Sequence, residues 1–433
     1  MAGYLEPSLE LFKTGSAPAV SQGAYLNTKR SGKFKAFKLK WSDVLVQRQR
    51  IYFDANANAP LLEAARQAMS GAAAVSGNPS SVHAEGRQAR TEVEMARGEV
   101  AALAGAGPDQ VIFTSGATEA VAMALTPNLH SGSKTIAASR LYVGATEHPC
   151  VLSGGRFEAG SLAVLPVDAN GVIDLASFEQ ILCGHDRMAG RPFVALMLAN
   201  NETGVIHPVA DAAAIARHYD AIILCDAVQA AGRISVDITA LGVDMIALSA
   251  HKIGGPKGAG ALILADDALR PAPLIAGGGQ ENYRRAGTEN VAAIAGFGVA
   301  AAAARHHLGE AGRIGDLRDK LEAGIKHVAP DAVIFGAAVK RLANTVLFAV
   351  PGINAETAVI AFDLEGISVS SGSACSSGKV GDSHVLAAMG VSPDMRRGGI
   401  RMSLPASAGS LEVKHVVDAW KRIYARLSDQ RAA

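Results

Sequence analysis

Four short apolar runs in this 433-residue chain each end in side chains that can do chemistry. The run 245–248 is followed by SAHK, which places Lys252 just before a glycine-rich segment. The other runs end in Asp226, in an asparagine pair that includes Asn201, and in the sequence SGATEA. An aspartate at the end of a buried strand is costly unless it meets a cation or hydrogen-bond donors. The four ends together therefore predict a polar functional site.

One cofactor can use this whole set of strand ends. Ligands of open α/β sheets bind beyond the carboxyl ends of the strands. Pyridoxal 5'-phosphate (PLP) needs a lysine for a Schiff base, a carboxylate for its pyridine nitrogen, and donors for its phosphate and phenolic oxygen. The turn in SGATEA opens a helix whose free N–H groups favour a phosphate, although Ser/Thr-x-x-Glu is also an ordinary helix cap. A P-loop interpretation of GGPKGAG fails, because no Ser or Thr follows Lys257.

The elements that must position these residues alternate between strand and helix patterns from Ile51 onward. Short runs rich in Val, Ile and Leu are apolar on both faces, which is typical of a parallel sheet covered by helices. They occupy 111–116, 193–200, 221–227, 245–250 and 260–265. Helical patterns separate them, for example at 117–125 and 208–219. We therefore predict an α/β fold with a doubly covered sheet.

The pattern changes near residue 300, where a long helical stretch begins. Strand patterns at 344–350 and 366–372 and a closing helix at 411–426 follow it. We predict a large domain over 51–300 and a smaller α+β domain over 301–433. Residues 1–50 carry a net charge of +6, against −5 for the remainder, and lack the apolar core of a secretory signal. They are expected to be a disordered leader, a transit peptide or the product of an upstream start codon.

The bulk composition indicates a globular protein in a reducing compartment. Net charge is +1, which gives no overall indication of nucleic-acid binding, and no run approaches the ~20 apolar residues of a membrane span. The four cysteines are too sparse for a disulfide scaffold and lack zinc-site spacing, so we expect a cytoplasmic protein. Cys150, Cys183 and Cys225 are expected to be buried small apolar residues. Cys375 lies in a Ser-, Gly- and Ala-rich loop and is expected to act through its thiolate.

From about Ile51 to the C-terminus, several motifs resemble those of group I cysteine desulfurases, the NifS/IscS-like branch of the class V aminotransferase family of PLP enzymes. The resemblance implies PLP-dependent fold type I, with a mostly parallel seven-stranded sheet in the large domain, and a homodimer with shared sites. It is carried by FDANANAP (53–60), GNPSSVHAEGR (77–87), FTSGATEA, ATEHPCVL (145–152), NNETGVI, SAHKIGGPKGAGAL (249–262), RRAGTEN (284–290), SSGSACSSG (370–378) and IRMSL (400–404).

The resemblance also implies a role for each site residue. Lys252 would form the Schiff base and shuttle protons, Asp226 would pair with the pyridine nitrogen, and Gln229 with the phenolic oxygen. His148 would stack on the ring and handle a proton at sulfur, and Asn201 would contact cofactor and substrate. The phosphate would be held by Ala117, Thr118, Ser249, His251 and, from the partner subunit, the residue matching Thr288.

The remaining implied roles concern the substrate, L-cysteine. Arg401 would bind its carboxylate, a bidentate task that suits arginine. Cys375 would accept the sulfur as a persulfide while L-alanine is released, for delivery to iron–sulfur cluster assembly, tRNA thiolation or nitrogenase maturation. The chain alone is expected to hold no metal; Cys375 would be a transient iron–sulfur ligand only with a scaffold partner. No direct contact with nucleic acid or membrane is expected.

Two other kinds of function remain open at this stage. A selenocysteine lyase or class V aminotransferase would need Lys252 and Asp226 but not Cys375. A non-catalytic binding protein of the same fold is a different class, against which the intact Lys252 argues. The chain also departs from the family in ANANAP (55–60), at Pro405, and in its short C-terminal end, IYARLSDQRAA (423–433). These departures leave the entry loop, the carboxylate pocket and the sulfur acceptor undetermined, in that order.

Overall fold

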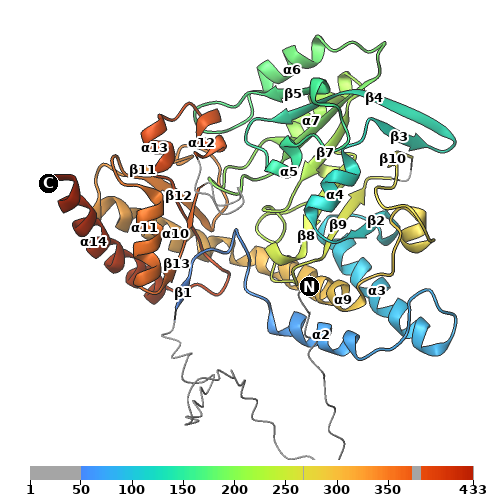
Figure 1. Ribbon diagram of the computed structural model, residues 1–433, viewed down its shortest axis with the longest axis horizontal. Helices are drawn as coiled ribbons and strands as arrows, with labels where there is room; N and C mark the ends of the chain where they lie inside the picture. The colour runs from blue at the N-terminus through green and yellow to red at the C-terminus, as the bar shows by residue number, and fades with distance from the viewer. Residues whose placement is uncertain (1–49, 267, 373–381, 433) are drawn as a thin grey trace, which may run out of the picture. The chain divides into compact units, whose positions relative to one another are not determined.

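The computed structural model describes residues 50–266, 268–372 and 382–432, and the chain divides into two compact units between Arg50 and Ile51. The predicted leader therefore lies outside the described residues, apart from Arg50. The second unit contains all the elements named below (Figure 1). Its longer helices are α2 (Glu63–Ala73), α3 (Ala84–Leu103), α4 (Ala117–Ala124), α6 (Leu175–Cys183), α7 (Val209–His218), α9 (Val291–His307), α10 (Ala311–Val328), α11 (Ala355–Leu364) and α14 (Ser410–Ala432). Its short helices are α5 (Pro149–Leu152), α8 (Ile238–Leu241), α12 (His384–Ala388) and α13 (Pro393–Arg397).

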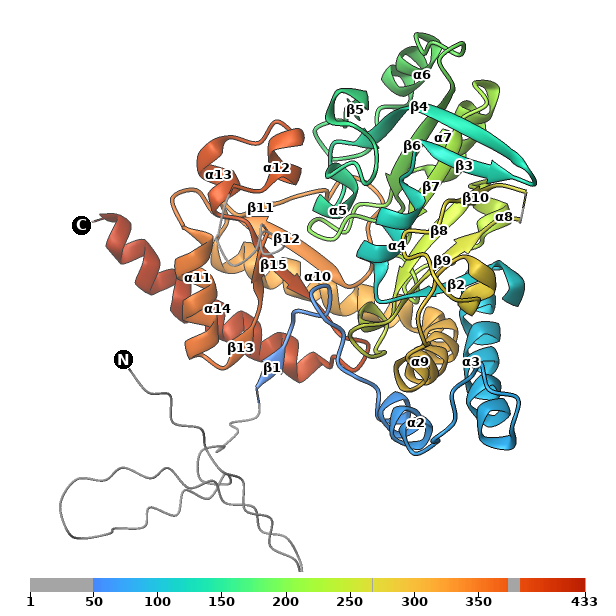
Figure 2. The same cartoon turned by 45° about the vertical axis from the view of Figure 1, so that its right-hand side comes forward.

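A nine-stranded mixed sheet forms the centre of the larger part of this unit (Figure 2). Its order is β10-β3-β4-β6-β7-β8-β9-β2, with β5 also pairing to β4. The strands are β2 (Val111–Thr114), β3 (Asn128–Ser131), β4 (Lys134–Gly144), β5 (Leu162–Leu165), β6 (Arg191–Met197), β7 (Ile222–Asp226), β8 (Met245–Ser249), β9 (Gly260–Leu264) and β10 (Arg270–Pro271). The predicted α/β class is confirmed, and every strand predicted for this sheet is present.

The sheet differs from the prediction in strand number and direction. It has nine described strands where seven were expected, and β9 runs antiparallel to both β8 and β2. The physical reason is the short connection after β8, because a parallel neighbour needs a crossover of a dozen residues or more. β2 and β8 consequently run in the same direction, and both end at the same edge of the sheet.

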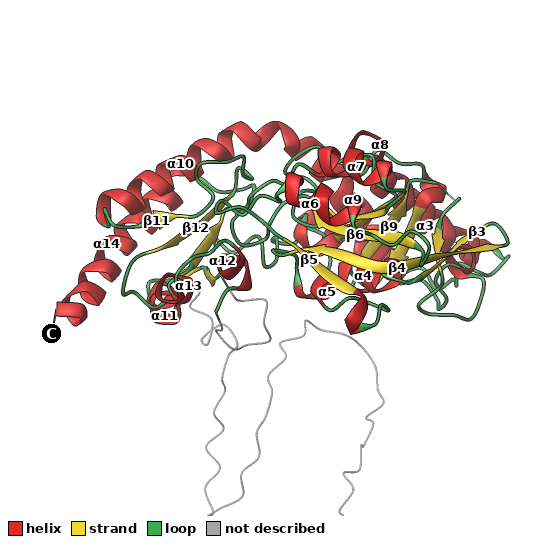
Figure 3. Cartoon of the chain, turned by 90° about the horizontal axis from the view of Figure 1, so that it is seen from above, coloured by secondary structure: helices red, strands yellow, loops and turns green. Residues whose placement is uncertain are grey.

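Side chains of the central strands alternate between two buried faces, as the double covering requires. On β7, Ile223 and Cys225 belong to one hydrophobic cluster, and Ile222 and Leu224 belong to another. Residues of α3, α7 and α9 complete the first cluster, and residues of α4 and α5 complete the second. Figure 3 shows this layered arrangement, with the sheet between the two sets of helices. Both faces of the central strands are therefore dry, which leaves only the strand ends for polar chemistry.

A nearly continuous helical stretch, Val291–Val328, follows the sheet and reaches the second hydrophobic core. By length and composition alone it could cross a membrane, but half of its most apolar window is buried inside the protein. Phe297 of α9 packs in the first core, whereas Leu321 and Ile325 of α10 pack in the second. The stretch is thus buried as a core helix is, and it joins the two hydrophobic cores.

The C-terminal core is built on a four-stranded sheet with the order β11-β12-β15-β14, backed by α10, α11 and α14. Trp420 of α14 lies at its centre, 5.4 Å from the ring of Phe348 and 5.9 Å from that of Phe362. The strands are β11 (Val333–Ile334), β12 (Thr345–Ala349), β14 (Ser370–Ser371) and β15 (Ile400–Ser403), with β1 (Ile51–Tyr52) and β13 (Ile367–Ser368) forming a separate pair.

The first described residues pack with the last third of the chain. β1 pairs in parallel with β13, and Phe53 is fully buried in the C-terminal core. Asp54 forms a bridge to Ser403, after which the chain turns toward the main sheet. The predicted domain division at residue 300 stays a prediction, but the segment 51–56 links the two cores.

We predict that Phe53→Ala destabilises the protein by about 3–5 kcal/mol, because it leaves a cavity among fully buried aromatic and aliphatic side chains. Chemical unfolding of the full chain with saturating PLP measures this. Leu61→Ala is the matched control, since Leu61 is 43% exposed and its loss should cost only about 0.5 kcal/mol. Equal effects of the two substitutions would contradict the link between 51–56 and the C-terminal core.

Candidate active site

Four strand ends meet at one edge of the main sheet. Met197 of β6 pairs with Asp226 of β7, which in turn pairs with Ala247 of β8. Gly260, the first residue of antiparallel β9, pairs with Ser249 and with Thr114 at the end of β2. A cavity of about 430 Å³ opens at this edge, and we call it the polar cavity. Its lining includes the predicted site residues Ala117, Thr118, His148, Asn201, Asp226, Gln229, Ser249, His251 and Lys252.

Lys252 lies at the end of a short 3-10 turn, Ala250–Lys252, that follows β8 directly. Its Nζ donates hydrogen bonds to the backbone oxygens of Asn56, at 2.7 Å, and Ala57, at 2.9 Å. Gln229 also donates to the oxygen of Asn56, at 3.0 Å. The amine is therefore held in the site by neutral acceptors from the segment that links the two cores.

The Asp226 carboxylate is buried at the end of β7. Burial raises its pKa to about 6, against the lowering effects of the Val228 N–H and of the Lys252 charge. Within the described part of the chain, the one hydrogen bond to the carboxylate comes from Val228 N, at 2.9 Å. Glu147 is buried close by, and burial together with the charge of Asp226 raises the pKa of its carboxyl, against the lowering effect of the Met197 N–H. Asp226 is thus a buried carboxylate that a further cation would stabilise.

His148 is the N-cap of α5, and its Nδ1 accepts a hydrogen bond from Cys150 N at 3.2 Å. Cys150 Sγ lies 3.0 Å from the same nitrogen. A backbone N–H can only donate, so Nδ1 carries no proton and the ring proton is on Nε2. Burial, with the charges of Lys252 and His384, lowers the pKa of His148 to about 4, so the ring is neutral at pH 7. Burial raises the pKa of Cys150 to about 12, so it remains a thiol that donates to His148.

The start of α4 forms one wall of the polar cavity. The first turn of any helix presents N–H groups that the helix cannot satisfy, and a Cβ added to Gly116 would meet nothing within 4 Å. A Cβ on Gly260 would lie 2.5 Å from the Gly116 backbone, so glycine there lets the turn lie directly against β9. Ser249 Oγ and His251 Nδ1 bond to each other at 3.0 Å beside this turn. Together these groups supply the donors that a phosphate requires.

Arg401 of β15 is 1% exposed and does not line the polar cavity, but it reaches the site through Asn201. Its Nη1 donates to Asn201 O at 3.1 Å, and its Nη2 forms an ion pair with Asp54 at 2.8 Å. Its Nε is buried without a hydrogen-bond partner in the described residues. A buried guanidinium with an unused N–H is able to accept a further anion.

Glu202 is the residue after Asn201 and is also buried. Burial raises its pKa to about 7, while the Ser383 hydroxyl, which donates to it at 2.6 Å, and the Arg401 charge act in the opposite direction. A Cβ added to Gly372 would lie 3.1 Å from the same carboxyl. Glu202 thus lies close to Gly372, just before the segment 373–381, and to Ser383, just after it.

The other sequence predictions have mixed outcomes. Cys375 lies outside the described residues, and Thr288 is exposed and does not line the polar cavity. Cys225 is buried as predicted, but the expectation for Cys183 was wrong, because its position at the end of the surface helix α6 leaves it exposed. Cys150 is only partly buried and lines the polar cavity instead of filling the core. In the described ranges, no group of three or more His, Cys, Asp or Glu is placed to hold a metal ion.

Sequence analysis missed several polar residues that the fold brings to this site. Glu147 and Glu202 each adjoin a predicted residue, inside ATEHPCVL and NNETGVI, so their motifs contained a signal. Asn56 lies in FDANANAP (53–60), a motif that carried the resemblance but to which no role was assigned, and part of which departs from the family. His384, whose Nε2 lies 2.9 Å from Glu147 O, has no motif that could have revealed it.

The charges and hydrogen-bond donors of these residues match the chemical groups of PLP. The buried Asp226 carboxylate matches a protonated pyridine nitrogen, the start of α4 matches a phosphate, and the Lys252 amine lies in the same cavity. The fold and the site thus define a PLP-dependent enzyme of fold type I.

Comparisons with known proteins agree with this class. A model of the family "Aminotransferase class-V" matches residues 51–416. The chain is 37% identical to the cysteine desulfurase IscS of Dictyoglomus turgidum over 88% of this chain and 96% of that protein. It is 36% identical to an IscS-like cysteine desulfurase of Mycobacterium tuberculosis over 85% of this chain and 93% of that protein. A NifS-like protein from Rickettsia africae has a similar structure, with a TM-score of 0.79, 33% identity, and coverage of 87% and 99%. The chain belongs to the class V aminotransferase family of PLP enzymes, in its NifS/IscS-type branch.

We predict that the free energy of unfolding of Glu202→Gln increases, relative to that of the natural protein, as the pH rises. The folded protein loses the Glu202 proton near pH 7 and the unfolded chain near 4.5. The stability from the neutral carboxyl is therefore fully present below pH 4.5 and is lost, by about 3 kcal/mol, as the pH rises to 7. Glutamine keeps an acceptor for Ser383 without the proton.

Melting temperatures of the two proteins between pH 5 and 8 measure this difference. Glu356→Gln, at an exposed position at the start of α11, is the control for removing a surface carboxyl in the same way. A Glu202→Gln difference that stayed constant over this range would contradict the burial of a neutral carboxyl.

Proposed function

We propose that this enzyme removes sulfur from L-cysteine, releasing L-alanine and leaving a persulfide on Cys375. The observation that carries the proposal is the presence of Lys252 and the buried Asp226 carboxylate in one cavity, with Arg401 held against the same wall. The overall reaction balances: L-cysteine and one enzyme thiol give L-alanine and one enzyme persulfide. The names of the relatives described above support the same activity.

The residues that would hold PLP follow from the donors around the polar cavity. Asp226 would face the ring nitrogen, Gln229 the phenolic oxygen, and His148 the ring itself. The phosphate would lie against the start of α4, with donors from Ala117, Thr118, Ser249, His251 and, from a second copy of the chain, Thr288. PLP, when bound, withdraws electrons from the Cα of the amino acid attached to it. A homodimer follows from the role of Thr288, which is exposed in the single chain.

Lys252 and His148 are the groups that move protons in this proposal. The Lys252 amine can remove the Cα proton once it is no longer engaged by Asn56 and Ala57. His148 is neutral and carries its proton on Nε2, so it acts first as a donor at that nitrogen. The thiol of Cys150 and its backbone N–H, at the start of α5, fix this orientation, because both donate hydrogen bonds to Nδ1.

Arg401 would bind the substrate carboxylate. Asp54 already neutralises part of its charge, so the buried guanidinium is held in place before substrate arrives. The Nε of Arg401, which has no hydrogen-bond partner in the described residues, is available to the incoming carboxylate. Substrate recognition therefore uses a cation fixed by the segment that links the two cores.

Cys375 is the proposed sulfur acceptor, through attack of its thiolate on the substrate sulfur. The thiolate forms the S–S bond while the C–S bond of the substrate breaks, and the electrons of that bond return to the carbon that becomes the methyl group of alanine. Transfer of the persulfide to a sulfur-acceptor or iron–sulfur scaffold protein in the cytoplasm completes the proposed role.

We predict that Cys375→Ala abolishes release of sulfide and alanine from L-cysteine, by more than about 100-fold, because the nucleophile is missing. Bound PLP and its yellow colour should remain unchanged. Cys183→Ala, at an exposed cysteine outside the polar cavity, is the matched control and should keep full activity. Full activity of Cys375→Ala on L-cysteine would instead favour a selenocysteine lyase or an aminotransferase.

A further inference from the structure

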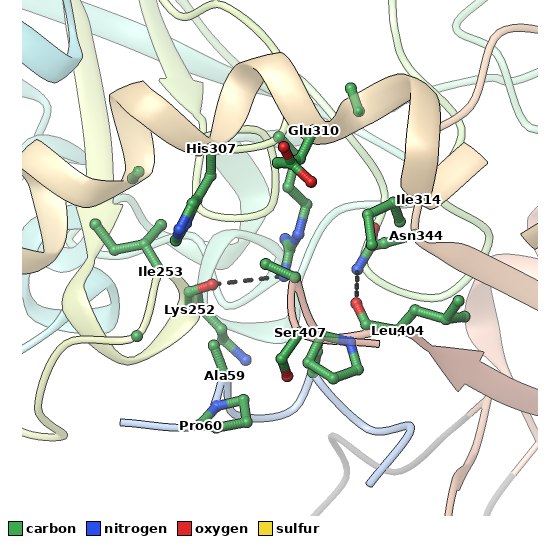
Figure 4. Close-up of a pocket in the computed structure, with 18 of the residues that line it drawn as sticks. Ala59, Pro60, Lys252, Ile253, His307, Glu310, Ile314, Asn344, Leu404 and Ser407 are labelled. Carbon is green, nitrogen blue, oxygen red and sulfur yellow. Dashed lines mark hydrogen bonds between the residues drawn. The ribbon is translucent and has the colours of Figure 1, made fainter. Parts of the chain in front are cut away.

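A second cavity, of about 470 Å³, adjoins the polar cavity at Lys252, which lines both. We call it the apolar cavity, because most of its wall is formed by small or aliphatic residues. Figure 4 shows it between the α9–α10 junction and the loop after Leu404, with Lys252 and Ile253 at one end. The aliphatic side chains on its wall include Leu62, Ile253, Ile314 and Leu404. Its volume is in the range of cavities that hold small molecules.

Arg233 supplies a positive charge in this wall. Its Nη1 donates to the backbone oxygen and to Oε1 of Gln229, at 2.7 and 2.6 Å, and its Nη2 donates to Lys252 O at 3.5 Å. All of these acceptors are neutral. Among the described residues, no carboxylate forms an ion pair with Arg233, and Glu310, which also lines the cavity, bonds to Arg313 at 2.6 Å.

This guanidinium is charged and poorly solvated. Burial, with the nearby charge of Arg401, lowers the pKa of Arg233 to about 10, so it is still protonated at pH 7. A partly buried cation whose hydrogen-bond acceptors are all neutral is stabilised by an anion. The small and aliphatic residues that form most of the wall favour a molecule with an apolar body.

The contacts of Arg233 also connect the apolar cavity to the active site. Because arginine can only donate, its bond fixes the oxygen of the Gln229 amide toward Arg233 and the nitrogen toward the polar cavity. Gln229 Nε2 and Lys252 Nζ share the oxygen of Asn56. An anion bound to Arg233 would compete with Gln229 Oε1 and so alter the group proposed to face the phenolic oxygen of PLP.

We propose that the apolar cavity is a second ligand site, which binds a small monocarboxylate with an aliphatic tail through Arg233 and transmits its occupancy to the active site through Gln229. The binding site stands independently of the proposed function. Its effect on the active site rests on one part of that function, the assignment of Gln229 to the cofactor, and does not depend on the role of Cys375.

Isothermal titration of the full-chain, PLP-loaded enzyme with hexanoate tests the binding site. Saturable binding of one hexanoate per chain is expected, with hexan-1-ol, which has the same chain length and no charge, binding at least about 10-fold more weakly. Equal affinity for the two probes, or no saturable binding of hexanoate, would overturn the proposal.

Two variants locate the bound probe. Ala311→Phe fills the apolar cavity from the start of α10 without contacting the polar cavity, so it should weaken hexanoate binding at least about 10-fold and leave the basal activity unchanged. Ala425→Phe, at an exposed position on α14, is the matched control and should leave hexanoate binding unchanged. Arg233→Met should also weaken it. Unchanged hexanoate affinity in Ala311→Phe would place the probe elsewhere, for example at Arg401, and would refute the site.

The visible absorbance of the bound cofactor tests the connection to the active site. Hexanoate should shift this absorbance in the natural enzyme at the concentration that fills the calorimetric site, and should not shift it in Ala311→Phe. Saturable binding with no spectral change would retain the ligand site and refute the coupling through Gln229. Failure of Cys375→Ala to lose activity would overturn the proposed desulfurase function without affecting either result.

Discussion

The buried negative charge of Asp226 is the constraint on which the rest of the site depends. A carboxylate at the end of a central strand, with dry helix layers on both faces, costs free energy that one backbone N–H does not offset. Burial raises the pKa of Asp226 for the same reason. In the proposed complex, the cationic ring nitrogen of PLP would supply the missing charge, so that cofactor binding would stabilise the buried Asp226.

The second constraint is the segment 51–56, which packs in the C-terminal core and also contacts residues of the active site. Phe53 is packed in the C-terminal core, Asp54 neutralises Arg401, and the oxygen of Asn56 accepts bonds from Lys252 and Gln229. The amine, the arginine proposed to bind the substrate carboxylate and the proposed partner of the phenolic oxygen therefore all contact the same six consecutive residues. Movement between the two cores would alter all three groups together, which is a physical route by which substrate binding and catalysis become linked.

Several features of the fold and site could be predicted from the sequence because their signals are local. Apolar runs located the central strands, and the polar residues directly after them, such as Asp226 and Lys252, do line one cavity. The direction of β9 was missed because it depends on the length of a connection and not on the composition of the strand. Cys183 was misjudged because its neighbours are apolar, although it lies on the exposed side of the helix that buries the adjacent Leu182.

The features that sequence could not predict are those created by contacts between distant segments. Asn56 and Lys252 are 196 residues apart, and Glu202 and Ser383 are 181 residues apart, so no periodicity or spacing relates them. The neutral state of His148 depends on burial and on the charges of Lys252 and His384, and the charge of Arg233 depends on which acids do not reach it. These properties follow from the folded structure alone.

Reduction of the PLP-loaded enzyme with borohydride, followed by peptide mapping, tests the central claim most directly. The account predicts one pyridoxyl group per chain, covalently attached to the residue between His251 and Ile253. A pyridoxyl group on another lysine, such as Lys257, or no covalent attachment at all, would contradict it.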